Sequence, residues 1–263
     1  MNITREKFFE LRNSIDNIEE LAKKLNTTVE ELTQWSKVKG WSLKKRPKIS
    51  NTKFFHDYNE YSCYWGGFLA ADGNVDQKGR IRLTLKHDDI NHLEKFKSCL
   101  GSNHTIGENT TKYNRCSFEF THIEMCEDLK YNFNIIPNKT FKYEMPSSIP
   151  SNMLRHYIRG YFDGDGSICE SFSNKNSRTA TLYATVSSGS EDFSRKLFTF
   201  FQDRLKLGGQ LQEFSDSIKF QIKFNTNDAR KLLNYMYEDS NIYLDRKYLL
   251  YERIVLDNIR QKR

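Results

Sequence analysis

Hydrophobic and polar residues alternate in two well-separated stretches of the chain. The stretches are "RIRLTLK", residues 80–86, and "TATLYATVS", residues 179–187. Successive side chains of a strand point to opposite faces, so each stretch predicts a strand with one apolar and one polar face. The apolar faces are expected to contain Ile81, Leu83 and Leu85 in the first strand, and Leu182, Ala184 and Val186 in the second.

Helical spacing of apolar residues follows each of these strands. The segments "DDINHLEKFKSCLG", residues 88–101, and "EDFSRKLFTFFQDRLKLG", residues 191–208, both read as amphipathic helices that stop at a glycine. Three further elements come next in both halves. The first is a weak strand, near 104–107 and near 210–214. An alternating strand follows, "RCSFEFT" in the first half and "SIKFQIKFN" in the second, and then a closing helix, "IEMCEDLKYNF" and "NDARKLLNYMY". The chain therefore reads as a duplicated α+β unit.

The strongest internal match precedes the first strand of each half. "YWGGFLAADG", residues 64–73, and "YIRGYFDGDG", residues 157–166, are helix-like runs that end in an aspartate and a glycine. An anion at the C-terminal end of a helix costs roughly 0.3–1 kcal/mol. Asp followed by Gly is also a common turn pair, in which the glycine caps a helix and the aspartate is solvated. The duplication favours a special role for Asp72 and Asp165.

The glycines in these runs predict a close helix crossing. Each costs up to about 1 kcal/mol of helix propensity relative to alanine, which only close packing or a special backbone would offset. If the helices pair about a pseudo-twofold axis, Asp72 and Asp165 meet, and a divalent cation such as Mg²⁺ would offset their repulsion. The interface glycines are expected to be Gly66, Gly67, Gly160 and Gly164.

Composition adds a charge argument. The 263 residues include 41 Lys plus Arg and 34 Asp plus Glu, a net charge of +7. This excess suits a polyanionic partner, although a basic protein without such a partner has the same composition. The sequence has no apolar run long enough for a membrane span, no signal peptide and no CxxC pair. We therefore expect an intracellular, cytoplasmic protein without membrane contact, disulfide framework or zinc site.

The two signature runs, "WGGFLAADG" and "IRGYFDGDG", resemble those of the LAGLIDADG homing endonucleases in their single-chain, two-repeat form. The resemblance covers roughly residues 60–255. It implies a duplicated αββαββα fold with pseudo-twofold symmetry, whose two antiparallel sheets form a saddle for DNA. The last acid of each motif, here Asp72 and Asp165, would hold two or three Mg²⁺ ions, for which Mn²⁺ or Ca²⁺ can substitute in binding. The backbone of Ala71 and Gly164 would assist, and Ala70 departs from Asp163 of the second copy.

The resemblance also implies an activity. A monomer would make a site-specific, Mg²⁺-dependent double-strand break in a long DNA target, cutting one phosphodiester per strand across the minor groove and leaving short 3′ overhangs. An intron RNA maturase, with intron RNA as partner, or a non-cleaving DNA-binding regulator on the same scaffold is the alternative. Expected DNA contacts from the polar strand faces are Arg80, Arg82, Lys86, Arg115, Arg178, Tyr183, Gln212, Lys219, Gln221 and Lys223.

Two lysines after the closing helices are candidates for the scissile phosphates. Family members often carry basic residues there, and "NIIPNKTF" and "NIYLDRKYLL" place Lys139 and Lys247 in similar settings. Such a cation could offset charge that builds on the phosphate. Arg246 competes with Lys247 for this role, and solvated charges without a catalytic role are the other interpretation.

A different kind of module is predicted at the N-terminus. "IEELAKKLNTTVEELTQWSK", residues 18–37, reads as two short helices joined at Asn26, as in a helix-turn-helix whose second helix would enter a major groove. The basic segment that follows, residues 37–51, reads as a linker that can touch the DNA backbone. The expected organisation is therefore a DNA-binding module with its linker at 1–50, a first repeat at 51–150 and a second repeat at 151–263.

Overall fold

The computed structural model describes residues 3–15, 17–43, 47–110, 113–172, 180–214 and 219–256. The chain forms two compact units, Met1–Lys48 and Ile49–Arg263. Arg178 and residues 44–46 of the predicted basic linker lie outside the described residues. None of the described helices has the length and apolar character that a membrane crossing requires.

The N-terminal unit contains the helices α1 (Arg5–Ser14), α2 (Ile18–Lys24) and α3 (Val29–Lys39). The two short helices predicted around Asn26 are present, and Asn26 itself adopts a left-handed backbone with φ of 52°. Thr28 starts α3 through a capping box with Glu31. The additional helix α1 contributes the fully buried Phe8, whose ring packs against Trp41. The turn therefore belongs to a three-helix core.

The second unit repeats one order of elements twice. The first half comprises α4 (Glu60–Asp72), β1 (Gly73–Val75), β2 (Arg80–Lys86), the 3-10 turn η1 (His87–Asp89), α5 (Ile90–Cys99), β3 (Gly107–Asn109), β4 (Arg115–Thr121) and α6 (Ile123–Phe133). The second comprises α7 (Leu154–Asp165), β5 (Gly166–Phe172), β6 (Ala180–Ser188), α8 (Glu191–Leu205), β7 (Gln210–Phe214), β8 (Lys219–Asn225), α9 (Thr226–Tyr237), α10 (Asp245–Tyr251) and the π-helical turn η2 (Glu252–Leu256). The duplicated α+β fold is confirmed.

Each half of this unit contributes one four-stranded antiparallel sheet in the described residues. The strand orders are β1-β2-β4-β3 and β5-β6-β8-β7, so the two sheets have the same topology. The weak strand expected near 104–107 is wrong in position, because β3 begins only at Gly107. Before it, the Ser102 hydroxyl accepts a hydrogen bond from the backbone N–H of His104, a local turn that competes with strand pairing.

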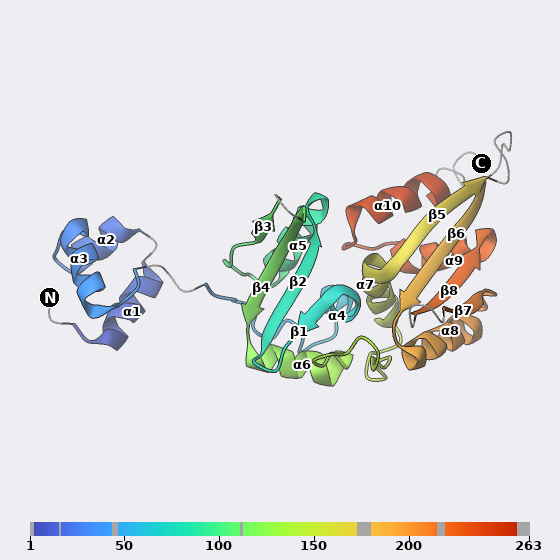
Figure 1. Cartoon of the computed structure of the whole chain (residues 1–263), viewed down its shortest axis with the longest axis horizontal. Helices are drawn as coiled ribbons and strands as arrows, with labels where there is room; N and C mark the ends of the chain where they lie inside the picture. Colours follow the sequence, from blue (N-terminus) through green and yellow to red (C-terminus); the bar gives the residue numbers. More distant parts are fainter. Residues whose placement is uncertain are drawn as a thin grey trace. The chain divides into compact units, whose positions relative to one another are not determined.

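The predicted alternation along β2 is confirmed. Ile81 and Leu83 are fully buried and lie opposite Phe120 and Phe118 of β4, whereas Arg80 on the same strand is exposed. Helices cover one face of each sheet and leave the other face open (Figure 1). Between the two sheets, α4 and α7 lie side by side (Figure 1). The ends of these two helices therefore lie next to the strands with open polar faces.

Candidate functional site

The crossing of α4 and α7 depends on a reciprocal pair of glycines. A Cβ added at Gly67 would overlap the backbone carbonyl oxygen of Tyr157, and a Cβ added at Gly160 would overlap that of Tyr64. Each glycine thus faces the residue that stands three positions before its counterpart. The two contacts are related by the pseudo-twofold symmetry of the repeat, and the backbones approach as closely as the glycines allow.

The other two predicted interface glycines behave differently from each other. A Cβ at Gly164 would stand 2.5 Å from the Cβ of Ala71 and 3.3 Å from Oδ2 of Asp72, so Gly164 does lie at the crossing. At Gly66 the expectation is wrong, because a Cβ there would meet the ring of Phe133 in α6. The second repeat has Arg159 at the equivalent position. The absence of a side chain at Gly66 makes room for Phe133 within the first repeat.

Both helices end at the aspartates and pass directly into strands. Gly73 and Gly166 have extended backbones, with φ of −77° and −95°, so neither forms the left-handed cap of an ordinary Asp-Gly helix end. A Cβ would stand 2.6 Å from the carbonyl oxygen of Leu69 at Gly73, and 2.5 Å from that of Phe162 at Gly166. Glycine is required here by a close approach, which carries the chain from helix to strand without a loop.

The carboxyl groups of Asp72 and Asp165 share one electrostatic environment. Asp72 keeps an exposed surface and Asp165 is half-buried, but the surrounding protein desolvates both. This desolvation, together with the charge of Asp165, raises the pKa of Asp72 to about 6. Desolvation also raises the pKa of Asp165. Lys139 and Lys247 oppose the shift at both acids, so four ionisable groups form one cluster at the helix ends.

Both predicted lysines lie in this cluster and are buried. Lys139 is 7 % exposed and donates a hydrogen bond to the carbonyl oxygen of Gly73. Lys247 is 3 % exposed and donates to three carbonyl oxygens of the last turn of α7 and its end. Burial lowers the pKa of each ammonium to about 8, while the nearby aspartates act in the opposite direction. The competing candidate, Arg246, is exposed and paired with Asp89.

The second repeat has Asp163 at the position that Ala70 occupies in the first, and this aspartate makes several hydrogen bonds. Asp163 is buried, and its carboxylate accepts hydrogen bonds from the hydroxyls of Tyr64 (2.7 Å) and Tyr237 (2.5 Å) and from the backbone N–H of Leu244 (2.8 Å). These partners lie 74 to 99 residues away in sequence, so no sequence pattern identifies them. Asp163 therefore connects α7 with α4, α9 and the segment before α10.

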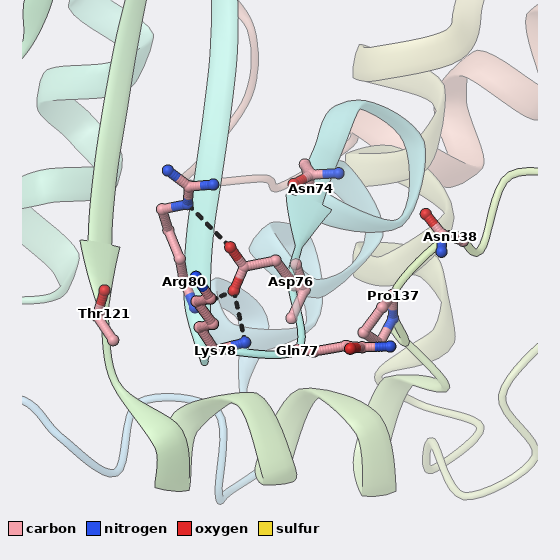
Figure 2. Close-up of a pocket in the computed structure, with 9 residues that line it drawn as sticks. Asn74, Asp76, Gln77, Lys78, Arg80, Thr121, Pro137 and Asn138 are labelled. Carbon is pink, nitrogen blue, oxygen red and sulfur yellow. Dashed lines mark hydrogen bonds and ion pairs between the residues drawn. The ribbon is translucent and has the colours of Figure 1, made fainter.

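The expected DNA contacts of the first repeat lie on the open face of its sheet, and two of them are paired with acids. The side chain of Arg80 donates to Asp76, which also accepts from the backbone N–H of Lys78 (Figure 2). These residues line a hollow of about 740 Å³ that Asn138 also borders. Arg82 is paired with Glu119 at 2.5 Å. Both guanidinium groups are thereby oriented before any ligand binds.

Further along this face, Lys86 and Arg115 stand directly opposite each other. They are register partners of β2 and β4, and both are exposed. Like charges that face each other across two strands destabilise a sheet. The arrangement is therefore suited to a bound polyanion, whose phosphates would remove the repulsion.

The second sheet carries its expected contacts around a larger hollow next to Asp165. The hollow has a volume of about 840 Å³ and is lined by Asp165, Tyr183, Lys219, Gln221 and Lys223, among other residues. Lys223 lies 4.0 Å from the centroid of the Tyr183 ring. Gln212 faces Gln221 from the neighbouring strand, outside the lining of the hollow. A basic surface thus leads from the sheet to the acid pair.

Sequence reasoning missed Phe141, which lies between α6 and α7. Its ring is 62 % exposed and borders the same hollow, close to Gly189. An exposed phenylalanine in a segment without helical or strand periodicity leaves no pattern that separates it from a loop residue. Its position places an apolar ring beside the otherwise polar face.

The donor set at the helix ends fits a hard divalent ion. It offers the carboxylates of Asp72 and Asp165, and oxygen donors of this kind suit Mg²⁺ and Ca²⁺. In the described part of the chain no group of three or more His, Cys, Asp and Glu residues could enclose a metal by itself. An ion here would complete its coordination with backbone oxygen, water or phosphate. Ala71 and Gly164, the two predicted backbone ligands, lie at the same crossing.

Comparison with known proteins identifies the fold. No protein-family model and no curated protein matches the sequence. Among solved structures, the LAGLIDADG homing endonuclease I-LtrWI bound to target DNA is similar with a TM-score of 0.54 and 12% identity, over 78% of this chain and 92% of that chain.

Two further structures of homing endonucleases give the same result. The LAGLIDADG homing endonuclease I-GzeII in complex with its DNA target has a TM-score of 0.52 and 14% identity, over 78% of this chain and 92% of that chain. The meganuclease I-SmaMI bound to an uncleaveable DNA has a TM-score of 0.53 and 13% identity, over 78% and 91%. The chain has the LAGLIDADG homing endonuclease fold, by structural rather than sequence similarity, as the paired motifs predict.

Proposed function

We propose that this protein is a site-specific DNA endonuclease of the homing type, which makes a divalent-metal-dependent double-strand break in a long target. The observation that carries the proposal is the meeting of Asp72 and Asp165 at a helix crossing held by reciprocal glycines, beside open strand faces rich in basic residues. The similar structures I-LtrWI and I-GzeII are described with DNA targets, and I-SmaMI with an uncleaved target and calcium ions. These descriptions support the same substrate class here.

The role proposed for each residue is supported by its position. Basic and amide side chains of the two sheets bind phosphates and base edges and hold the duplex across the helix ends. Asp72 and Asp165 would hold the divalent ions, which when bound would supply Lewis-acid stabilisation of the cut phosphate and lower the pKa of bound water. The raised pKa of Asp72, about 6, supports this role, because charge on the pair is disfavoured without a cation. Lys139 and Lys247 provide fixed positive charge beside them.

The test measures cutting and binding separately. Asp72→Asn and Asp165→Asn are each expected to reduce Mg²⁺-dependent cleavage of a DNA selected from a random library by more than about 100-fold, with little loss of binding. Asp203→Asn on the exposed face of α8 is the control and should cut like the wild type. Unchanged cleavage in both site variants would refute the assignment. Binding without any cleavage by the wild type would favour a regulator, and stimulation of intron splicing that survives both substitutions would favour a maturase.

The N-terminal unit is proposed to add a second DNA contact. Its helices α2 and α3 are separated by a short turn, as in a helix-turn-helix, and α3 exposes Gln34 and Lys37. Tethering of such a module would raise the effective concentration of the nuclease at its site without changing the bonds that are cut. The proposed organisation is a DNA-binding module at 1–50 followed by repeats at 51–150 and 151–263.

A further inference from the structure

The two buried lysines use their N–H groups differently. The ammonium of Lys247 donates to the carbonyl oxygens of Phe162 (2.6 Å), Asp163 (2.8 Å) and Gly166 (2.7 Å). A lysine ammonium has three N–H donors. All three are therefore occupied by the C-terminal end of α7, and none remains for a phosphate.

Lys139 is not saturated in this way. Among the residues that the structure describes, it makes one hydrogen bond, to the carbonyl oxygen of Gly73 at 2.9 Å. Two of its N–H donors are consequently available. Its charge acts on both Asp72 and Asp165, so the ammonium stands beside the acid pair where a phosphate would be bound.

One position of the repeat differs between the halves in the same sense. In the second half, the carboxylate of Asp163 accepts from the backbone N–H of Leu244, which stands three residues before Lys247. This bond ties the segment that carries Lys247 to α7. In the first half the equivalent residue is Ala70, whose methyl group offers no acceptor, so the segment with Lys139 lacks this tie.

We propose that the two halves of the active site are chemically unequal, with Lys139 contacting the scissile phosphate of one strand and Lys247 serving as a positioning residue for the end of α7. The inference rests on the proposed endonuclease function. Lys247 fixes the turn that ends in Asp165, whereas Lys139 can donate to charge that develops on its phosphate. The strand beside Lys139 is therefore cut faster, and a singly nicked duplex accumulates before the double-strand break.

The first test uses the wild-type protein, so it does not depend on the folding of a variant. A target duplex carrying a different end label on each strand is cut in a single turnover with Mg²⁺, and the rate is measured for each strand. Unequal rates and a transient nicked species are expected. Equal rates would overturn this inference and leave the proposed function intact, whereas no cleavage of any selected DNA would overturn both.

A matched pair of substitutions then assigns the lysines. Lys139→Met is expected to slow the faster strand by about 100-fold and to shift Tm little, because one hydrogen bond to the protein is lost. Lys142→Met, on an exposed residue three positions away, is the control and should leave both rates unchanged. Equal slowing of both strands by Lys139→Met would contradict the inference.

Lys247→Met should instead lower Tm and slow both strands, because three carbonyl groups lose their donor. If that variant does not fold, Lys247→Arg retains the charge but cannot place three donors from one nitrogen. Lys247→Arg is expected to lower Tm and, because Asp165 is displaced, to raise the Mg²⁺ concentration needed for half-maximal cutting. Lys139→Met should leave that Mg²⁺ concentration unchanged. A strand-selective loss in a Lys247 variant with unchanged Tm would overturn the inference.

Discussion

Tyr64 of α4 donates a hydrogen bond of 2.7 Å to the carboxylate of Asp163 in α7. Each of these residues belongs to a different copy of the repeated motif, so the bond joins the two copies directly. It is also asymmetric, because Ala70 stands where Asp163 does in the second copy, and the hydroxyl of Tyr157 pairs instead with that of Tyr143, between α6 and α7. The two copies are thus joined by a hydrogen bond that has no equivalent on the other side of the pseudo-twofold axis.

Removal of the Asp163 carboxylate should destabilise the protein strongly. Asp163→Ala leaves two buried tyrosine hydroxyls and the N–H of Leu244 without their acceptor, and we expect the free energy of unfolding to fall by about 3 kcal/mol or more. Urea denaturation measures the loss. Asp203→Ala, on an exposed helical surface, is the control. A change below about 1 kcal/mol for Asp163→Ala would show that the network contributes little.

The reciprocal glycines predict a steric cost. Gly67→Ala and Gly160→Ala each place a methyl group onto a backbone carbonyl of the other helix, and either should lower the free energy of unfolding by about 1–3 kcal/mol despite the better helix propensity of alanine. Gly107→Ala is the matched control, because a Cβ there stands 3.3 Å from the Ser117 hydroxyl, which can rotate. If the helix variants proved as stable as wild type, the close crossing would be wrong.

The like-charge pair on the first sheet predicts effects of opposite sign on stability and binding. Lys86→Ala removes the repulsion with Arg115 and should stabilise the free protein by about 0.2–1 kcal/mol. It should also weaken DNA binding and reduce the salt slope of log K by about 1, as expected for one lost phosphate contact. Fluorescence anisotropy across a salt series measures this. An unchanged slope would place Lys86 outside the DNA contact.

Stability should depend on pH through His156. Burial, with Arg159 and Arg155 nearby, lowers the pKa of His156 to about 4, although Glu60 opposes the shift. Because the folded pKa lies below that of an unfolded histidine, the unfolded chain binds the proton more readily between about pH 6.5 and 4. Stability should therefore fall as the pH drops through this range, by at most about 3 kcal/mol.

The comparison with His156→Gln isolates this contribution from the titration of carboxyl groups. The unfolding free energy of the wild type minus that of the variant should decrease from about pH 7 to about pH 4. Over this range protonation of unfolded His156 destabilises the wild type, and the variant has no such group. A difference that stays constant over this interval would show that His156 does not titrate with a lowered pKa.

Substitutions in the N-terminal unit should change the affinity for DNA without changing the position of the cut. Lys37→Ala and Gln34→Ala, both on the exposed side of α3, should weaken binding to a long target severalfold, because a tethered second contact is lost. On a target trimmed to the central site the variants and wild type should bind alike. Equal binding on the long target as well would remove the module from DNA recognition.

The sequence by itself determined the duplication and two of the strands, because period-2 spacing and a repeated motif are local patterns. The strand predicted at 80–86 has those bounds, and the one predicted at 179–187 runs from Ala180 to Ser188. The sequence also indicated that the glycines serve a crossing, but it could not separate Gly67, which faces α7, from Gly66, which faces Phe133. Adjacent positions of a helix point in different directions, and only the packed neighbours decide which one is filled.

Only the tertiary structure decided which hydrogen bonds the basic side chains make beside the acids and on the first sheet. Lys139 and Lys247 look equivalent in sequence, yet among the described residues Lys139 donates to a single carbonyl oxygen and Lys247 to three. Arg80 and Arg82 read as open basic positions, yet Asp76 and Glu119 orient them. Hydrogen bonds of this kind join residues that are distant in sequence, and they depend on atomic distances that a linear pattern does not record.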